Sequence, residues 1–433
     1  MLSTPLFYAG IVHYGSSFLY VLLIILYLVI LPLAFIYSLY GTALHLLKTR
    51  FTFLNLLLPP SLWVIADYLR EMTDFFIPWG FIGYSQVYTP FIQIADITGI
   101  YGVSFIIVYT NYVLAQYIVS RQKKIINLVP LTILITAVFV YGIIKEKKIT
   151  GLPETETINI TGVQGNTGSL DRWDSSLSFM TYRNYIELTT ENHNSNGIVI
   201  WPETVLNSSD RVNFEIMKSV NSLIGDESLF ITGGTRKDAD GNTFNSIFIS
   251  SRGILKHIYD KKILFPYSER RFAGLSHGSI MGSPDTFAEG DSSPLFRHGN
   301  FTIGLSVCFE SLYPSYIRNA AAGGADILIN VANDSWFGNT YEPHMHLYSN
   351  IVRAVENRRF IARVTNSGVS AIITPSGRLA DSLDLNKEGV ISGTSGKTGL
   401  ISFYTIFGDL IIIFAALIVM SGITLYILSP AEK

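Results

Sequence analysis

Three short stretches of this 433-residue chain carry side chains that could perform covalent chemistry. The first covers residues 303–310, begins as an apolar β-type run and reaches Cys308, the only cysteine, followed two positions later by Glu310. A strand would point Cys308 and Glu310 to the same side. A thiol beside a carboxylate can act as a covalent nucleophile, but a single cysteine is also typical of a buried core. Taken alone, this stretch leaves both interpretations open.

The other two stretches supply an acid and an amine. Residues 198–203 form an apolar run that ends on Glu203, and the carboxyl end of a strand is where α/β folds place their chemistry. Glu203 would equally suit the start of a following helix. Residues 259–269 contain Lys261 and Lys262, which in isolation are typical of a solvated face.

Considered together, Glu203, Lys261 and Cys308 each follow a β-type run, in that order along the chain. A carboxylate can take the thiol proton as a general base, and a lysine can lower the thiol pKa and hold an oxyanion. The resulting thiolate would attack an acyl carbon. The set therefore predicts covalent catalysis through a thioester.

The composition restricts the class of protein. Hydrophobic residues make up 48% of the chain, charged residues only 15%, and the mean hydropathy is positive, so the charge content is low for a soluble protein. A formal net charge of −2 argues against nucleic acid as a partner, for which a basic surface is expected. His344 and His346 are close in sequence, but no Cys or carboxylate spacing completes a metal set. We therefore expect neither a metal site nor a cofactor.

Long apolar runs indicate membrane spans. No charged residue occurs before Lys48. Apolar runs cover residues 17–47, 51–68, 99–119, 125–144 and 410–428. At 1.5 Å per residue, about 20 residues cross a bilayer. The chain is therefore predicted to have a transmembrane domain at residues 1–150 with about four spans, and a final span within residues 399–433.

Basic loops predict the orientation of these spans. Lys48 and Arg50 follow the first run, and a second basic loop covers residues 121–124. Such loops are typically cytoplasmic, so the domain that follows residue 144 is expected to face outward. The Pro-, Gly- and aromatic-rich residues 77–86 then suit an interfacial turn with anchoring rings. Asp67 and Asp96 flank this turn and are expected to face an interior or water.

The pattern changes between residues 157 and 396 to short β-type runs separated by helical stretches. The predicted strands are residues 158–163, 197–200, 229–232, 246–250, 302–307, 327–331 and 370–374. The predicted helices are residues 176–191, 211–223, 313–322 and 346–357. Alternating strands and helices over some 240 residues predict one layered α/β domain.

The order Glu, Lys, Cys with these flanks resembles the nitrilase, or carbon–nitrogen hydrolase, superfamily, whose fold is an αββα sandwich. Spans before and after such a domain are similar to the apolipoprotein N-acyltransferase family. The resemblance extends through residues 79–86, 162–166, 173–174, 201–204, 265–269, 308–310, 333–338 and 363–368. It implies an α-helical membrane bundle joined to a nitrilase-like sandwich at residues 157–396.

The resemblance also implies roles for particular residues. Glu203 would be the general base, Lys261 the oxyanion stabiliser and Cys308 the nucleophile. Glu269 and Glu310 would be supporting carboxylates near the thiol; each would otherwise be a surface acid.

Two tryptophans complete the implied site. Trp173 and Trp336 would lie on mobile arms around the acyl entrance, although each would equally suit a core aromatic. The sequence departs from the family in having Phe309 where Tyr is typical, Tyr267–Ser268 in place of Phe-Gly, and fewer N-terminal spans than the family usually has.

The activity implied is acyl transfer at the outer, periplasmic face of a bacterial inner membrane. An acyl chain would pass from a membrane phospholipid to Cys308, and then to the α-amino group of the diacylglyceryl-cysteine at a lipoprotein N-terminus. Two alternatives stay open. One is a membrane-tethered nitrilase-type amidase, in which water is the second acceptor; the other is a non-catalytic membrane scaffold.

Overall fold

The computed structural model describes residues 26, 30–47, 52–72, 77–119, 128–152, 155–168, 175–193, 196–207, 209–266, 268–270 and 286–428. These residues divide into two compact units. The globular unit takes its described residues from 153–354 and 358–400, and the helical unit takes them from 23–152, 355–357 and 401–433.

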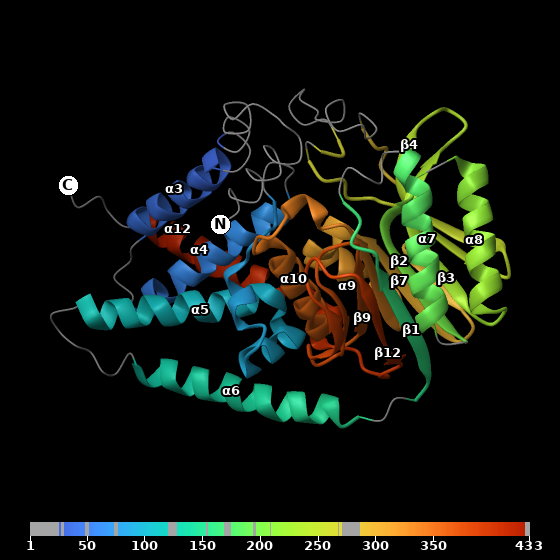
Figure 1. Ribbon diagram of the computed structural model, residues 1–433. Helices are drawn as coiled ribbons and strands as arrows, with labels where there is room; N and C mark the ends of the chain where they lie inside the picture. The colour runs from blue at the N-terminus through green and yellow to red at the C-terminus, as the bar shows by residue number, and fades with distance from the viewer. Residues whose placement is uncertain are drawn as a thin grey trace. The chain divides into compact units, whose positions relative to one another are not determined.

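The globular unit is built on two six-stranded sheets (Figure 1). The first sheet contains β1 (Thr157–Gln164), β2 (Gly197–Leu206), β3 (Leu229–Lys237), β4 (Thr243–Ser251), β5 (Ile254–Asp260) and β12 (Gly389–Gly396), in the order β12-β1-β2-β3-β4-β5. The second contains β6 (Leu295–His298), β7 (Phe301–Val307), β8 (Ile327–Ala332), β9 (Phe360–Thr365), β10 (Ser370–Ile373) and β11 (Leu379–Leu383), in the order β11-β10-β9-β8-β7-β6.

Each sheet has a parallel centre and antiparallel flanks. In the first sheet, β1, β2 and β3 are parallel and are joined through α7 (Ser175–Asn192) and α8 (Asp210–Ile224). In the second, β7, β8 and β9 are parallel and are joined through α9 (Pro314–Ala322) and α10 (Glu342–Asn357). The carboxyl ends of parallel strands are the preferred place for a site in such sheets, so each sheet offers one such edge.

The alternation of side chains along β2 explains the layers. Ile198 and Ile200 point into a core shared with strands of the second sheet, whereas Val199 and Trp201 pack with side chains of α7 and α8. Because successive residues of a strand face opposite sides, a continuously apolar strand must be covered on both. The result is the predicted αββα sandwich, and every predicted strand and helix of this domain is present. The strands β5, β6, β9, β11 and β12 were not among the predicted ones.

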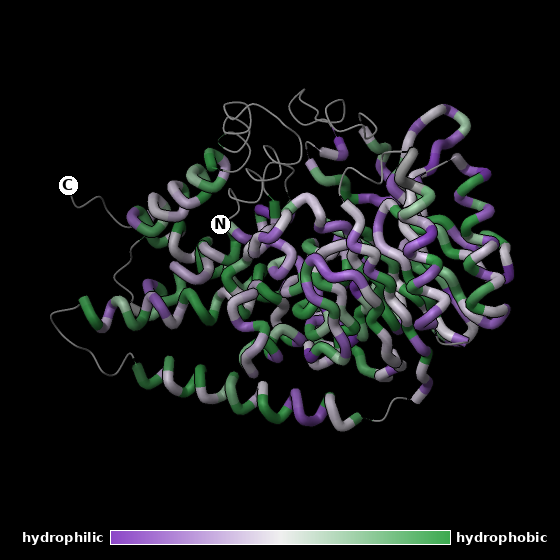
Figure 2. Tube along the Cα trace, viewed as in Figure 1, coloured by the Kyte–Doolittle hydropathy of each residue, from purple (hydrophilic) through white to green (hydrophobic). Residues whose placement is uncertain are grey.

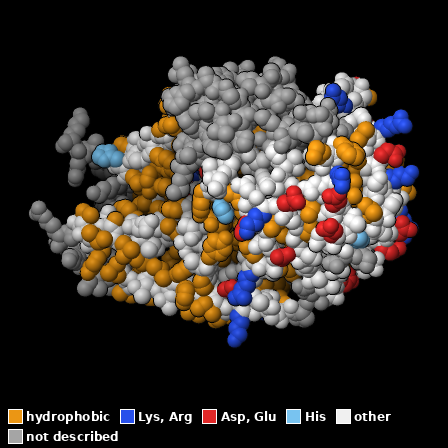
Figure 3. Space-filling view, viewed as in Figure 1, with side chains coloured by type: hydrophobic (Ala, Val, Ile, Leu, Met, Phe, Trp, Pro, Cys, Tyr) orange, Lys and Arg blue, Asp and Glu red, His pale blue; other side chains and the backbone are white. Residues whose placement is uncertain are grey.

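The helical unit consists mainly of long apolar helices. They are α3 (Leu31–Leu46), α4 (Thr52–Met72), α5 (Ala95–Val119), α6 (Leu128–Thr150) and α12 (Leu410–Leu428), with the short helices η3 (Ile82–Gln86), η4 (Pro90–Ile94) and α11 (Phe403–Phe407). Hydrophobic residues run along α5 and α6 (Figure 2). In the space-filling view, hydrophobic side chains gather over the helices, whereas acidic and basic ones gather over the globular unit (Figure 3).

Among the described residues, three helical segments, Pro90–Val119, Leu128–Thr150 and Leu410–Leu428, are long and apolar enough to cross a membrane. This is consistent with a membrane protein, but it is fewer than the five predicted spans. α4 is helical as predicted but is not one of these segments, and it carries Asp67, Arg70 and Glu71 in its last turns. α3 is an apolar helix of 16 residues, and residues 1–25 of the first predicted span lie outside the described residues.

Residues 77–86, which we expected to form an interfacial turn with anchoring rings, contribute their rings to the protein interior. Trp79, Phe81 and Tyr84 are all buried inside the helical unit. Arg70 holds the segment from α4, because its guanidinium donates hydrogen bonds to the backbone carbonyls of Ile77 (3.1 Å) and Trp79. The rings are therefore part of the packing of this unit.

The two carboxylates beside that segment have charged partners. Asp67 pairs with Arg70 at 3.1 Å, and Asp96 pairs with Lys145 at 2.9 Å and accepts a hydrogen bond from Tyr141. Buried carboxylates need such partners, and both side chains face the interior of the unit as predicted.

Candidate active site

Cys308 lies at a sharp turn directly after a parallel strand. β7 ends at Val307, and Cys308 begins a short 3₁₀ helix, η8 (Cys308–Leu312). Its φ angle is +49°, a left-handed conformation that a residue other than glycine rarely adopts and that the surrounding contacts must hold. The expectation that Cys308 and Glu310 share one face of a strand is therefore wrong, since the strand stops before both.

Glu310 is fully buried beneath the turn. Its carboxylate accepts hydrogen bonds from the backbone N–H groups of Val307 (2.7 Å), Lys262 (2.7 Å) and Ile263 (3.1 Å), and from the hydroxyl of Tyr259 (2.7 Å). Burial raises the pKa of Glu310, although these donors oppose the shift. The carboxylate thereby ties the end of β7 to the segment that follows β5.

Four side chains, which we name the base cluster, converge from the first sheet and the segment after β5: Glu203, Asn245, Lys261 and Glu269. The Lys261 ammonium lies 2.7 Å from a Glu269 oxygen and 3.7 Å from a Glu203 oxygen. Asn245 links the two acids, since its amide donates to Glu203 (2.7 Å) and to Glu269 (2.9 Å). Glu203 and Lys261 are thus brought together as the sequence predicts, and Glu269 joins them.

The backbone around Glu203 is irregular. β2 pairs with β3 as far as Trp201 and resumes at Leu206, so Glu203 sits in a bulge within β2 instead of at its end. Thr204 has a φ of +55°. A Cβ on Gly233 of β3 would lie 2.5 Å from the Cα of Glu203, so only glycine permits this close approach. Bulges of this kind redirect side chains next to active sites.

The charges of the base cluster favour an ammonium on Lys261. Burial works against that charge, but the carboxylates of Glu269 and Glu203 outweigh it and raise the pKa of Lys261. Of the two acids, Glu269 lies closer to the ammonium and also accepts a hydrogen bond from the backbone N–H of Phe265 (2.7 Å). Glu203 keeps the longer contact, which leaves it better placed to accept a proton.

The same charged groups also shift the pKa of the Cys308 thiol. Burial, followed by the negative charge of Glu203, raises the pKa of Cys308 well above its usual value, and Lys261 lowers it only in part. The sequence-based expectation that Lys261 would lower the thiol pKa is correct for that one interaction but not for the sum. The resting side chain is therefore a thiol, and a thiolate requires a base to remove the proton.

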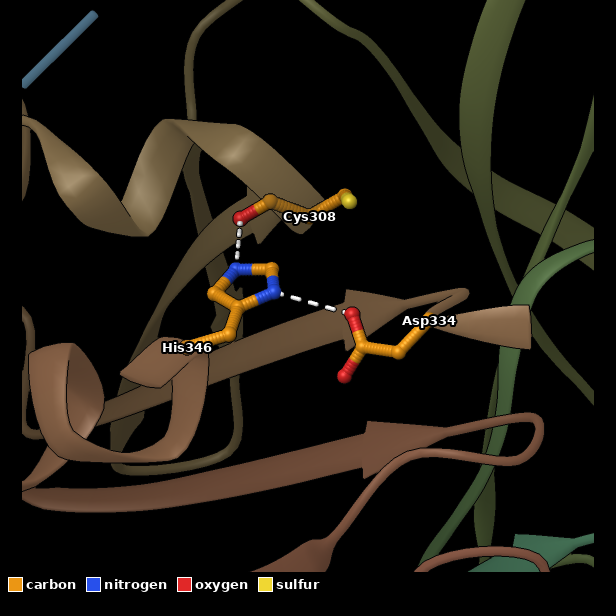
Figure 4. Close-up of side chains that lie close together, drawn as sticks. All are labelled: Cys308, Asp334 and His346. Carbon is orange, nitrogen blue, oxygen red and sulfur yellow. Dashed lines mark hydrogen bonds and ion pairs between the residues drawn. The ribbon is translucent and has the colours of Figure 1, made fainter. Parts of the chain in front are cut away.

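A second group, which we name the support cluster, lies on the other side of Cys308: Asn330, Asp334, His346 and Arg363, all fully buried. His346 bridges Asp334 and Cys308, with Nδ1 2.9 Å from the Asp334 carboxylate and Nε2 3.0 Å from the Cys308 carbonyl oxygen (Figure 4). Arg363 donates to Asp334 and to the Asn330 side-chain oxygen (2.7 Å). Despite burial, Arg363 and His346 lower the pKa of Asp334, so it is a carboxylate.

Cys308, Asp334 and His346 also place possible metal ligands within 4.8 Å of one another. Asp334, however, is already neutralised by the Arg363 guanidinium, and His346 Nε2 faces a backbone oxygen instead of the sulfur. Figure 4 shows the sulfur on the opposite side of Cys308 from the imidazole. This arrangement is typical of an orienting hydrogen-bond network, not of a cation site.

The remaining predicted residues have separate outcomes. Trp336 is half-buried in η9 (Ser335–Phe337), directly after Asp334. Trp173 and Tyr267 lie outside the described residues. Phe309 is buried, and its ring packs edge-on against Phe265. The residue that stands where the family typically has Tyr therefore contributes to aromatic packing.

Sequence reasoning missed Asn245 and gave no role to Asp334, His346 or Arg363. Two signals were available. Asn245 faces the same side of β4 as Ile247 and Ile249, which lie in the core between the sheets. A polar side chain on that apolar face could have been recognised as a candidate site residue. Arg363 interrupts an otherwise apolar run that forms β9, and a buried charge of this kind requires a partner.

Two family profiles and several known proteins are similar to this chain in sequence. Residues 160–395 match the profile of the family described as Carbon-nitrogen hydrolase, and residues 2–113 match the Apolipoprotein N-acyltransferase N-terminal domain. An apolipoprotein N-acyltransferase of Geobacter metallireducens is 30% identical over 81% of this chain and 70% of its own length. The enzyme of the same name from Coxiella burnetii is 26% identical over 94% of this chain and 85% of its own length. Among solved structures, Nit3 of Saccharomyces cerevisiae, from the nitrilase superfamily, is 14% identical and covers 57% of this chain and 91% of its own, with a TM-score of 0.43.

Proposed function

Because this chain belongs to the apolipoprotein N-acyltransferase family of the carbon–nitrogen hydrolases, we propose that it transfers an acyl chain from a membrane phospholipid to the α-amino group of a diacylglyceryl-cysteine at a lipoprotein N-terminus. Cys308 carries the acyl chain between the two. The observation that supports this most is that Glu203, Lys261 and Cys308, far apart in sequence, interact at the carboxyl edge of the sandwich.

In the first half-reaction, Glu203 accepts the thiol proton as the sulfur attacks an ester carbonyl of the phospholipid. The new C–S bond displaces the carbonyl π electrons onto oxygen. Lys261 and the backbone N–H that follows Cys308 stabilise this oxyanion. Collapse breaks the ester C–O bond, and the departing lysophospholipid oxygen takes the proton back from Glu203.

In the second half-reaction, the acceptor amine attacks the thioester. Glu203 takes a proton from the nitrogen, the C–S bond breaks, and the sulfur recovers a proton. An amide is more stable than a thioester, so the transfer runs downhill. Because Glu203 ends each half-reaction in the state in which it began, one carboxylate serves both.

The apolar helices have a role in delivering the substrates. Both the acyl donor and the diacylglyceryl acceptor are anchored in a bilayer, so they reach a membrane-bound enzyme sideways within that bilayer. The basic loops at residues 48–50 and 121–124 support an orientation in which the globular unit faces the periplasmic side of a bacterial inner membrane. Trp336, half-buried next to Asp334, would contact the acyl chain there.

Two experiments test the proposal. Full-length protein in detergent micelles is given a phospholipid with a labelled acyl chain and a synthetic diacylglyceryl-cysteine peptide. We expect the label on the peptide amine with the wild type, and no transfer with Cys308→Ser. Release of the label as free fatty acid, with none on the peptide, would instead identify a hydrolase.

The second experiment is complementation of a bacterial strain that lacks its own N-acylating enzyme. The wild-type chain is expected to restore growth, whereas Cys308→Ser is not. Equal rescue by both would leave a non-catalytic scaffold as the better explanation.

A further inference from the structure

His346 takes no part in the steps above, yet it contacts the backbone of the nucleophilic residue. The carbonyl oxygen of Cys308 accepts from the Ser311 hydroxyl at 3.1 Å and the Asn330 amide at 3.3 Å, and His346 Nε2 lies 3.0 Å from it. A carbonyl has two lone pairs, so this oxygen is saturated with donors. Such saturation at a single carbonyl fixes the orientation of its peptide group.

The orientation of that peptide matters on its other face. The Cys308–Phe309 peptide is trans, so its N–H points away from its carbonyl oxygen. Figure 4 shows the carbonyl oxygen directed at His346 and the sulfur on the opposite side. Holding the carbonyl back therefore directs the Phe309 N–H toward the side on which the thiol reacts. The left-handed φ of +49° at Cys308 is a strained conformation that would otherwise relax.

We propose that His346 is a positioning residue, which holds the Cys308 carbonyl so that the N–H of the same peptide is aimed at the oxyanion. The inference rests on the proposed acyl transfer. It requires a ring protonated on both nitrogens, so that Nδ1–H donates to Asp334 and Nε2–H donates to the peptide, because a neutral imidazole offers only one donor. Asp334 is itself fixed by Arg363, so the ring cannot shift without disturbing the support cluster.

Because the two ring nitrogens contact different partners, two substitutions can separate their contributions. In His346→Gln, the side-chain amide reaches as far as Nε2 and keeps a donor to the Cys308 carbonyl. In His346→Asn, the amide reaches only as far as Nδ1, so the donor to Asp334 is kept and the donor to the peptide is lost. Both variants remove the imidazole and leave a smaller or differently shaped buried side chain. Packing alone would also favour glutamine, which is closer in size to histidine, so the comparison needs a second reaction of Cys308 as its control.

Two reactions of Cys308 separate positioning from general damage. Acylation by a phospholipid forms an oxyanion, whereas alkylation by iodoacetamide displaces iodide at a saturated carbon and forms none. We expect His346→Asn to slow acylation by about 10- to 100-fold, part of what loss of an oxyanion donor costs. His346→Gln should stay within about threefold of the wild type, and alkylation should stay within about threefold in both variants, since the thiol and base cluster are unchanged.

The rates of acyl-enzyme formation and alkylation are measured by intact-mass spectrometry of the full-length protein. Equal acylation rates for the Gln and Asn variants, or parallel losses in acylation and alkylation, would overturn the proposal. If either variant does not fold, Ser311→Ala removes a second donor to the same carbonyl; it should slow acylation and spare alkylation, and the reverse pattern would contradict us. Failure of the wild type to acylate at all would instead reject the proposed function.

Discussion

The two polar clusters that flank Cys308 differ in how their charges are balanced. In the base cluster, two carboxylates, Glu203 and Glu269, share the single ammonium of Lys261. In the support cluster, the single carboxylate of Asp334 is held by a guanidinium and an imidazole. The largest charge effects on the thiol pKa come from Glu203 and Lys261 of the first cluster, with a smaller one from Asp334, whereas only the second cluster contacts the backbone carbonyl of the same residue.

This difference relates charge balance to chemical role. Excess negative charge beside the thiol raises the pKa of Cys308 and leaves a carboxylate available to receive a proton. The Arg363 guanidinium, together with His346, lowers the pKa of Asp334, so that acid stays ionised and fixed. A cluster with an unneutralised base can exchange protons, and a cluster with every acceptor filled can only hold geometry. The following substitutions test that distinction.

Glu203→Gln should have the largest effect on catalysis. It removes the general base, so acyl transfer should fall by about 10²- to 10⁴-fold. It also removes a charge that raises the thiol pKa, so alkylation of Cys308 by iodoacetamide at pH 8 should become several-fold faster. The two rates are measured on the same preparation. Loss of both together would show that Glu203 maintains the fold instead of acting as a base.

Lys261→Met should lower acyl transfer by about 10²- to 10³-fold, because an oxyanion donor is lost. Alkylation should change in the opposite direction to Glu203→Gln and become slower, since Lys261 lowers the thiol pKa. The matched control is Lys262→Met. That residue contacts Glu310 through its backbone N–H, which the substitution keeps, so little change is expected. A comparable loss in the control would contradict the assignment to Lys261.

Arg363→Leu should affect stability more than proton transfer. It leaves Asp334 buried beside His346 alone, and removing one partner of a buried ion pair costs about 3–5 kcal/mol. Arg252→Leu is the control, because its ion pair with Glu227 is exposed and such pairs contribute only about 0–1 kcal/mol. Unfolding in detergent monitors both. Equal small changes would mean that the support cluster is not held by charge.

The acid dependence of stability provides the smallest expected effect. The folded-state pKa of Asp334 is lowered, below the value of about 3.9 expected in an unfolded chain. Its stabilising contribution is therefore complete above about pH 4 and is lost as the pH falls through the folded value. The difference in unfolding free energy between wild type and Asp334→Asn should shrink below pH 4. A difference that stayed constant down to pH 2 would contradict the lowered pKa.

Much of the fold could be predicted, because its central strands are continuous apolar runs. β2, β7 and β8 are buried on both faces along most of their length, so most of their residues are apolar, without a polar alternation. The missed strands lack this signal. β12 consists largely of small residues, and β9 contains Arg363, whose charge is compensated only by residues distant in sequence.

The site could be predicted in its reactive residues but not in its geometry. Glu203, Lys261 and Cys308 stand after recognisable β-type runs, and their types limit the chemistry they can perform. The left-handed turn at Cys308 and the bulge at Glu203 depend on tertiary contacts, and no local pattern shows them. For the same reason, the net rise of the thiol pKa was not predictable, since burial outweighs the lysine.

The most direct test of this account is whether Cys308 itself carries the acyl group. The purified full-length protein is incubated with a phospholipid of one defined acyl chain and no acceptor, and its intact mass is measured. We predict a mass increase equal to that acyl chain, located on the peptide that contains Cys308 and removed by hydroxylamine, as a thioester requires. An unmodified protein, or an adduct that persists in Cys308→Ala, would contradict the account.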